Sequence, residues 1–432
     1  MKKLTMKKRL TVGGVLIFTG LTAAMMMSCA SHDSANAGQT QPKNVIFMVP
    51  DGMGLSNVTT SRIYKNGPNG DSLNFEKLPY IGYQRTHSLN STVTDSAAAA
   101  SAWASGEKFN NGEISCLDND NDGVCDETRI NSQTILEVAQ EMGMGTGLVA
   151  TSDITHATPA VFGAHVHNRK CESEIFSQFI KHGIDVLMGG GVATNRSSCL
   201  LGATDDAFNA ALIEQAQSNG YAYVNYKSEL DAVGTPEKLL GLFHDGGLTP
   251  IYQRSADSVE PTLADMTHAA LNILEQKPNG FFLMVEGSQI DWADHARNVA
   301  YMVQEVLDFD DSVKIVWDWI NETEERKKNT LLVVVADHET GGVIIDGPYG
   351  SLSQNGGTAS QLVLPSGTAV TDQDGNPVMA PDVSVVFGSN HENPTQSAGH
   401  TAVDTIIRSN SPQCAKAMDN TELYQIMMDF ML

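Results

Sequence analysis

Three short apolar runs, each followed within two residues by a carboxylate, constrain the fold of this chain more than any other feature. The runs are residues 44–49, 281–285 and 331–335, and the carboxylates are Asp51, Glu286 and Asp337. Such runs are typical of strands that are buried on both faces of a parallel sheet. Because ligands bind at the carboxyl edge of open α/β sheets, we expect these carboxylates to contribute to a site there.

Helical and strand-like patterns alternate along the rest of the chain. Strands are expected over residues 147–150 and 185–188, and helices over residues 135–142, 174–181, 205–218, 262–274 and 294–320. This alternation predicts one α/β domain over residues 43–432, with a mostly parallel central sheet sandwiched by helices. Residues 342–393 are expected to be an inserted irregular region, with a hairpin at Asp374 and Gly375.

The N-terminus has the layout of an export signal, because five basic residues precede the apolar run 10–27. We interpret residues 1–28 as a signal peptide and residues 29–42 as an unstructured tether. Cleavage before Cys29 would permit a lipid anchor on that residue. There are two alternatives: cleavage after Ala37, and an N-terminal helix that is retained in the membrane. The mature protein is expected outside the cytoplasm, either periplasmic or anchored to the outer membrane.

The chain is strongly acidic, with 51 Asp and Glu residues against 27 Lys and Arg and a formal net charge of −24. This excess of negative charge argues against a nucleic-acid partner, because binding to phosphate backbones requires a basic surface. An acidic protein that handles an anionic small molecule needs local positive charge, and bound metal ions are its densest source.

Export also permits disulfides. Five cysteines follow Cys29, and the pairings favoured by their proximity in sequence are Cys116 with Cys125 and Cys171 with Cys199. Cys414 would then be unpaired.

The segment between the first two of these cysteines resembles the start of a calcium loop. Asp118, Asp120 and Asp122 alternate with asparagines and precede a glycine, but the twelfth position is Arg129 rather than glutamate. It is therefore not an EF-hand. Calcium binding is one interpretation, and a solvated loop closed by a disulfide is the other.

An alanine-rich segment, residues 94–106, predicts a helix that begins near Ser96. The first turn of a helix presents unpaired N–H groups, which form a site for anions such as phosphate or sulfate. A serine hydroxyl there is a poor nucleophile until a base or a metal activates it. A plain helix cap is the alternative interpretation.

Two Asp/His pairs indicate zinc. Asp291 and His295 are four residues apart, so one helical turn brings both side chains to one face, and Asp337 and His338 are adjacent at a strand end. Carboxylate and imidazole groups are zinc ligands. A single pair would be interpreted as a surface salt link, but repeated pairs at strand ends favour metal binding.

Six segments of the chain closely resemble the alkaline phosphatase family, and they occur in the family's order. They are Pro-Asp-Gly-Met-Gly (50–54), Thr-Asp-Ser-Ala (94–97), His-Ala-Thr-Pro-Ala (156–160) continuing to His-Val-His-Asn-Arg (165–169), the segment 286–295, Asp-His-Glu-Thr-Gly-Gly (337–342) and Gly-His-Thr (399–401). The resemblance implies hydrolysis of phosphate monoesters through a covalent phosphoserine, and a homodimer is a further expectation.

The resemblance also implies a role for each matching residue. Ser96 would be the nucleophile, and Arg169 would bind two phosphate oxygens beside Asp95. The implied metal ligands are Asp291, His295 and His400 for one zinc ion, Asp51, Asp337 and His338 for a second, and Asp51, Thr158 and Glu286 for a magnesium ion. His391 is an alternative to His400, although His400 fits the family's pattern.

Two residues near the implied third metal depart from parts of the family. His156 stands where some members have aspartate, and Trp292 where some have lysine or histidine. An imidazole shifts the preference toward softer ions, so the identity of the third metal stays open.

Two other functions remain to be distinguished. A related metal-dependent enzyme could hydrolyse phosphate diesters or sulfate esters, although Arg169 with Glu286 and Thr158 favours monoesters. A non-catalytic metal- or phosphate-binding protein is the second alternative, and the presence of Ser96 argues against it.

Overall fold

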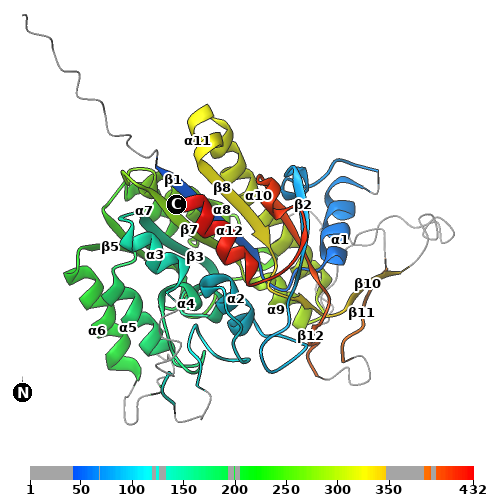
Figure 1. The fold of residues 1–432 in the computed structure, drawn as a ribbon, viewed down its shortest axis with the longest axis horizontal. Coiled ribbons are helices and arrows are strands. Elements are labelled where there is room, and N and C mark those ends of the chain that lie inside the picture. Colours follow the sequence, from blue (N-terminus) through cyan, green and yellow to red (C-terminus); the bar gives the residue numbers. More distant parts are fainter. Residues whose placement is uncertain are drawn as a thin grey trace, which may run out of the picture. The chain divides into compact units, whose positions relative to one another are not determined.

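A ten-stranded sheet forms the centre of the protein (Figure 1). The structure is a computed structural model that describes residues 42–432 except 68, 119–122, 126–132, 193–198, 200–204, 347–383 and 391–395. The strands, in spatial order, are β14 (Ala417–Asp419), β2 (Tyr80–Arg85), β13 (Thr405–Ser409), β8 (Thr330–Val335), β1 (Lys43–Pro50), β7 (Gly280–Gly287), β3 (Gly145–Asp153), β4 (Val186–Gly190), β6 (Lys238–Leu242) and β5 (Tyr221–Val224). Neighbours from β8 to β5 are parallel, and β13 runs antiparallel to β2 and β8.

Strand β1 is buried on both faces, as its apolar sequence predicts. Val45 and Phe47 enter one hydrophobic core, whereas Ile46 and Met48 enter the other. Helices α2 (Ser96–Ser105), α3 (Ile135–Glu141), α4 (Ala157–Gly163), α5 (Glu172–His182), α6 (Asp205–Ser218) and α12 (Glu422–Met431) contribute to the first core. Helices α1 (Leu55–Asn66), α7 (Lys227–Ala232), α8 (Leu263–Leu274), α9 (Gln289–His295) and α10 (Val299–Asn321) contribute to the second. The predicted sheet sandwiched by helices is therefore confirmed.

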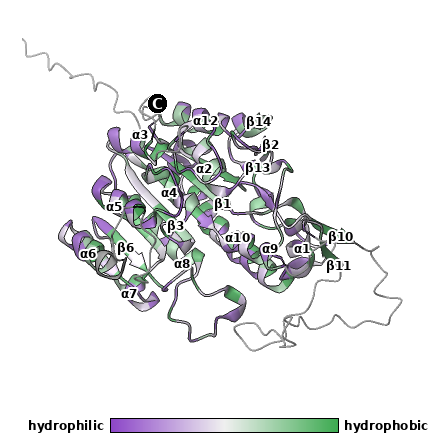
Figure 2. Cartoon of the chain, turned by 90° about the horizontal axis from the view of Figure 1, so that it is seen from below, coloured by the Kyte–Doolittle hydropathy of each residue, from purple (hydrophilic) through white to green (hydrophobic). Residues whose placement is uncertain are grey.

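Most outer helices are amphipathic, which is why they can cover the sheet. In Figure 2, α5 and α6 carry both hydrophilic and hydrophobic residues. Ile175 and Phe179 of α5 are buried, whereas Lys181 on the same helix is exposed. Burying such an apolar stripe stabilises both the helix and the sheet below it.

The prediction of one helix over residues 294–320 is wrong in one respect. The chain forms α9 and α10 instead, with a break at Arg297, whose φ of 51° lies in the left-handed region. Asn298 then caps α10 by accepting a hydrogen bond from the backbone N–H of Tyr301. The apolar stripe that marks α10 begins only at Val299, so the predicted start at residue 294 was too early.

Short elements complete the fold around the sheet. They are β9 (Glu339–Thr340), β10 (Val343–Asp346), β11 (Ser384–Phe387), β12 (His400–Thr401), α11 (Glu324–Asn329) and the 3-10 helices η1 (Phe75–Lys77), η2 (Ile251–Gln253) and η4 (Pro412–Cys414). Strands β10 and β11 pair with each other, as do β9 and β12. The hairpin expected at Asp374 and Gly375 lies outside the described residues.

Both predicted disulfides are present. Cys116 is bonded to Cys125 and Cys171 to Cys199, while Cys414 is buried with a free thiol. Among the helices that the structure describes, none is long and apolar enough to span a membrane. Cys29 and the rest of the expected signal and tether lie outside the described residues.

Candidate metal centre

Three strand ends bring their carboxylates together, because β1 lies between β7 and β8. The register places Val49 of β1 beside Glu286 of β7. Asp51 follows the end of β1, and Asp337 follows the end of β8. Asp51, Glu286 and Asp337 are completely buried. The expected convergence of these carboxylates at one edge of the sheet is present in the structure.

Asp291, His295 and His400 form a first group of ligand-type side chains. The carboxylate of Asp291 lies 3.3 Å from Nε2 of His295 and 3.5 Å from Nε2 of His400. The Nδ1 atoms of the two imidazoles bond to the carbonyls of Ala398 and Thr94, so the Nε2 atoms are the free ligand atoms. These two Nε2 atoms are only 3.1 Å apart, which is close enough for both to bind the same cation.

Asp51, Asp337 and His338 form a second group. Nε2 of His338 lies 3.1 Å from Oδ2 of Asp337 and 3.8 Å from Oδ1 of Asp51. Oδ1 of Asp337 accepts hydrogen bonds from the backbone N–H groups of Gly52 and His338, both at 3.0 Å. The carboxylate is thereby fixed with its other oxygen directed into the group.

Asp51 is shared with a third group, which also contains Glu286 and His156. Both carboxylate oxygens of Asp51, both of Glu286 and the hydroxyl of Thr158 are buried without a hydrogen-bond partner. Buried polar atoms normally have partners, because burying them alone costs free energy. Oxygen atoms of this kind are the ligands that a hard cation such as Mg²⁺ prefers, so the residues fit the implied metal.

The electrostatics of these groups also favour bound cations. Burial raises the pKa of Asp51 well above its usual range, and the neighbouring carboxylates of Asp337, Asp291 and Glu286 raise it further. Burial likewise raises the pKa of Glu286 to about 7. Burial also acts to raise the pKa of Asp291, but the nearby histidines, led by His295, hold it below its usual range. A bound cation would relieve the repulsion between these carboxylates.

Ser96 lies at the edge of the second group. It is the first residue of α2, and its Oγ lies 3.3 Å from Nε2 of His338. The helix cap is Asp95, whose side chain accepts a hydrogen bond from the N–H of Ala98. Ser96 is therefore not the cap of the helix, and its hydroxyl is free to face the ligand groups.

Arg169 reaches the same region from the loop between α4 and α5. Its Nη1 donates to Oδ2 of Asp95 at 3.0 Å, and its Nη2 lies 3.2 Å from Nε2 of His156. Burial lowers the pKa of His156 to about 3, and the positive charge of Arg169 acts in the same direction. His156 is therefore a neutral imidazole, and its Nε2 accepts the hydrogen bond from Arg169.

His156 also packs against Trp292. The two rings meet edge to face, with centroids 5.9 Å apart. His156 thus contacts Trp292 and also belongs to the third group.

Some residues proposed from the sequence do not join the site. Asp118 accepts a hydrogen bond from the N–H of Gly123, within the loop closed by the first disulfide. Asp120 and Asp122 lie outside the described residues, as does His391.

One residue that links two of the groups, Thr340, was not predicted from the sequence. The Thr340 hydroxyl bonds to Oδ1 of Asp291 and lies 3.2 Å from Nδ1 of His338. Thr340 stands within the segment 337–342 that carried the resemblance, so its position was a signal that could have identified it.

The chain is similar to known proteins over most of its length. The family model for alkaline phosphatase matches residues 42–431. Alkaline phosphatase 3 of Bacillus subtilis (strain 168) is 37% identical over 352 residues, which cover 78% of this chain and 70% of that protein. The alkaline phosphatase of Escherichia coli (strain K12) is 31% identical to this chain, and the match covers 96% of this chain and 90% of that protein.

A solved structure is also similar. It is a variant of the alkaline phosphatase from the Antarctic bacterium TAB5 with Mg bound in its M3 site, and its TM-score is 0.67. It is 27% identical to this chain, and the match covers 90% of this chain and 98% of that one. Because the family model, the two relatives and the similar fold all agree, the chain belongs to the alkaline phosphatase family.

Proposed function

We propose that this phosphatase hydrolyses phosphate monoesters through a covalent phosphoserine on Ser96, with two zinc ions and one magnesium ion bound beside it. The observation that carries the proposal is the set of buried oxygens of Asp51, Glu286 and Asp337 that lack hydrogen-bond partners. Three buried carboxylates so close together are strongly unfavourable unless cations accompany them. Ser96 lies next to this set through its contact with His338.

The ligand atoms divide according to their chemistry. The two groups that contain imidazoles suit zinc, which binds nitrogen and carboxylate ligands. One zinc ion would be held by Asp291, His295 and His400, and the other by Asp51, Asp337 and His338. Magnesium would be held by Asp51, Glu286 and Thr158. When bound, these ions supply positive charge that lowers the pKa of a hydroxyl group and stabilises a leaving alkoxide.

Ser96 would act as the nucleophile in the first step. The Ser96 hydroxyl gives up its proton as its Oγ forms a bond to phosphorus, and the bond from phosphorus to the ester oxygen breaks. The leaving alkoxide takes up one proton in exchange, by way of the solvent, and departs as an alcohol. In the second step a water oxygen replaces Oγ on phosphorus, so inorganic phosphate leaves and the Ser96 hydroxyl is restored. Because Ser96 is the first residue of α2, the N–H groups of the first helical turn would favour negative charge on the phosphate in both steps.

Arg169 would bind two oxygens of the phosphate through its planar guanidinium, a geometry that lysine cannot reproduce. Asp95 holds one side of this group and His156 contacts the other. Both partners fix its orientation before the substrate arrives, which reduces the entropy lost on binding.

The test is to assay purified protein on a monoester, a diester and a sulfate ester that share one leaving group, with and without a chelator. We expect rapid hydrolysis of the monoester, loss of activity with the chelator and recovery when zinc and magnesium are restored. Mass spectrometry after acid quenching should find phosphate on Ser96. Preference for the diester or sulfate ester would contradict the proposed substrate class, and absence of all activity would favour a binding protein.

We also infer that the protein is exported. The basic and apolar N-terminal sequence motivates this inference, and the two disulfides agree with an oxidising compartment. Cell fractionation followed by mass measurement of the N-terminus would distinguish a free periplasmic form from a lipid-anchored form at Cys29. Recovery of the full-length chain from the cytoplasm would contradict export.

A further inference from the structure

Asn111 and Gly112, in the loop after α2, are each hydrogen-bonded to one member of the Asp95–Arg169 ion pair. The side-chain oxygen of Asn111 accepts from the backbone N–H of Asp95 at 3.2 Å. The backbone carbonyl of Gly112 accepts from the backbone N–H of Arg169 at 2.7 Å. With the ion pair itself at 3.0 Å, these four residues form a closed ring of contacts.

The Asn111 side chain is held at both ends of its amide. While its oxygen accepts from Asp95, its nitrogen donates to the carbonyl of Val93 at 3.1 Å. Its own backbone N–H donates to the side-chain oxygen of Asn90 at 3.0 Å. Asn111 therefore fixes the extended segment that leads directly into Ser96.

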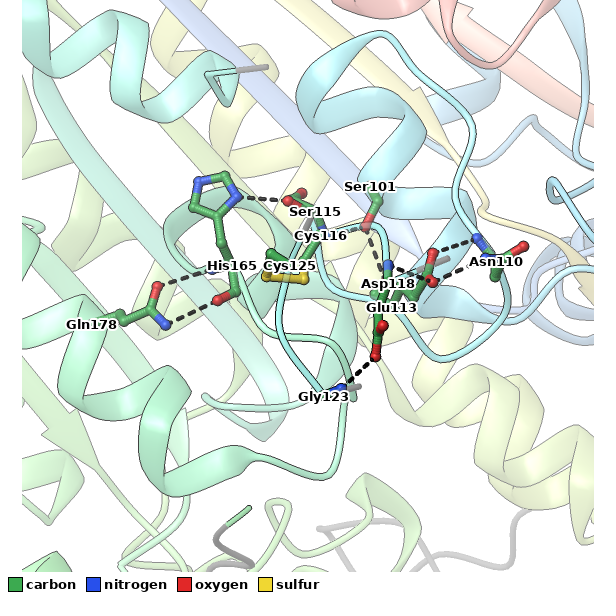
Figure 3. Close-up of a disulfide and its surroundings, with 10 residues drawn as sticks. All are labelled: Ser101, Asn110, Glu113, Ser115, Cys116, Asp118, Gly123, Cys125, His165 and Gln178. Carbon is green, nitrogen blue, oxygen red and sulfur yellow. Dashed lines mark hydrogen bonds between the residues drawn. A yellow bond between two sulfur atoms is a disulfide. The ribbon is translucent and has the colours of Figure 1, made fainter. Parts of the chain in front are cut away.

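The loop that carries Asn111 is rigidly supported from within. The buried carboxylate of Glu113 accepts from the backbone N–H groups of Asn110 at 2.7 Å and Asp118 at 3.2 Å. The N–H of Ser115 donates to the hydroxyl of Ser101 on α2 at 2.8 Å. Figure 3 shows these contacts beside the first disulfide.

The same loop is attached to the segment that carries Arg169. Ile114 and Val166 exchange two backbone hydrogen bonds, of 3.0 and 3.1 Å. The Nδ1 atom of His165 contacts the carbonyl of Ser115 at 2.6 Å, a contact also drawn in Figure 3. The loop thus connects the Ser96 helix to the Arg169 segment through backbone contacts that are independent of the ion pair.

We propose that Asn111 is a positioning residue for phosphate binding, and that it acts by setting the place of Arg169 relative to Asp95 and Ser96. The inference rests on the proposed function, in which Arg169 binds the phosphate. A forked guanidinium loses affinity for phosphate when it shifts by a fraction of an ångström, because its two hydrogen bonds can no longer form together. Asn111 is exposed, so its removal should change overall stability little while changing this alignment.

The experiment measures the competitive inhibition constant of inorganic phosphate for the metal-loaded enzyme. Arg169→Ala should raise this constant about thirtyfold, the loss of a charged hydrogen-bonding group. Asn111→Ala should raise this constant about fivefold, a factor typical of the free energy of one hydrogen bond. In the double variant the constant should equal that of Arg169→Ala alone, because Asn111 acts through Arg169.

Asn410 supplies a matched control far from the site. Like Asn111, it accepts from a backbone N–H, that of Leu332 at 2.9 Å, and donates to a backbone carbonyl, that of Thr330 at 2.8 Å. Asn410→Ala should leave the phosphate constant unchanged. An unchanged constant in Asn111→Ala, or the same fivefold rise in the Arg169→Ala background, would overturn the inference. An unchanged constant in Arg169→Ala would instead overturn the phosphate role of Arg169, and the inference with it.

A second pair of variants tests the ring from its other side. Gly112 has a φ of +92° and Gly220 a φ of +89°, and a Cβ added to either would meet no atom within 4 Å. Alanine should therefore strain both positions alike, but only Gly112→Ala should turn the carbonyl that holds Arg169. We expect phosphate to inhibit Gly112→Ala severalfold more weakly than the wild type. Gly220→Ala should have the same inhibition constant as the wild type. Equal effects of the two substitutions would contradict positioning by this loop.

Discussion

The imidazole rings of His338 and His400 stack with centroids 3.6 Å apart and planes inclined by 23°. His400 belongs to the first group of ligand-type residues and His338 to the second, so this contact joins the two implied zinc sites. Burial, together with the neighbouring His338, lowers the pKa of His400 to about 4. His400 is therefore neutral at physiological pH, which is the form that binds a metal.

Replacing the nucleophile separates chemistry from metal binding. Ser96→Ala should lower the turnover number on the order of a thousandfold, because no covalent intermediate can form. Its zinc content should stay near that of the wild type, since none of the proposed ligands changes. Steady-state kinetics and elemental analysis of the same preparation check both points. Activity like that of the wild type would contradict the phosphoserine mechanism.

The two candidate histidines can be separated by metal content. His400→Ala removes one proposed nitrogen ligand of the first zinc ion, so zinc stoichiometry and activity should fall together. His391→Ala should leave both near normal. Elemental analysis after gel filtration gives the stoichiometry. Zinc loss in His391→Ala, with His400→Ala unaffected, would move the ligand to His391.

His156 should tune the third metal site. Its neutral imidazole lies with Asp51 and Glu286, where an aspartate would add a negative charge that favours magnesium. His156→Asp should therefore make activity more dependent on added magnesium. The measurement is a magnesium titration of activity for both proteins, after loosely bound metal has been removed. Superimposable curves would mean that His156 does not influence this site.

A buried glutamate on α10 should make the protein less stable at high pH. Burial, together with the neighbouring Asp308, raises the pKa of Glu305 to about 8, from 4.5 for an ordinary glutamate. Between these two pKa values the folded chain keeps the proton and the unfolded chain releases it. Stability from the protonated group is complete at acid pH and is lost as the pH rises toward 8.

Glu305→Gln tests this pH dependence, because glutamine resembles the protonated acid and keeps an oxygen for the N–H of Ile251. Denaturant unfolding at pH 5 should give similar free energies for both proteins. At pH 9 the variant should be more stable by on the order of 2 kcal/mol. Equal stabilities at both pH values would show that Glu305 is not held protonated in the folded protein.

Local pattern was enough to predict five of the ten strands, β1, β3, β4, β7 and β8, and part of the candidate site. Asp51, Glu286 and Asp337 each end an apolar run, and Asp291 and His295 share one helical turn, so short-range periodicity located them. The break at Arg297 could not be predicted in this way, because it depends on one left-handed residue that lies just before the apolar stripe begins at Val299.

The sequence by itself determined which residue types stand at strand and helix ends, because these depend on neighbours a few positions away. Tertiary structure brings about the sharing of Asp51 by two groups, which the sequence implied only through the family resemblance, since it requires β1 to lie between β7 and β8. It also decided that Asn111 holds Asp95, and that His400 meets His338 from a strand 62 residues further along the chain. Such contacts join segments far apart in sequence, and packing of the whole chain brings them within hydrogen-bonding distance.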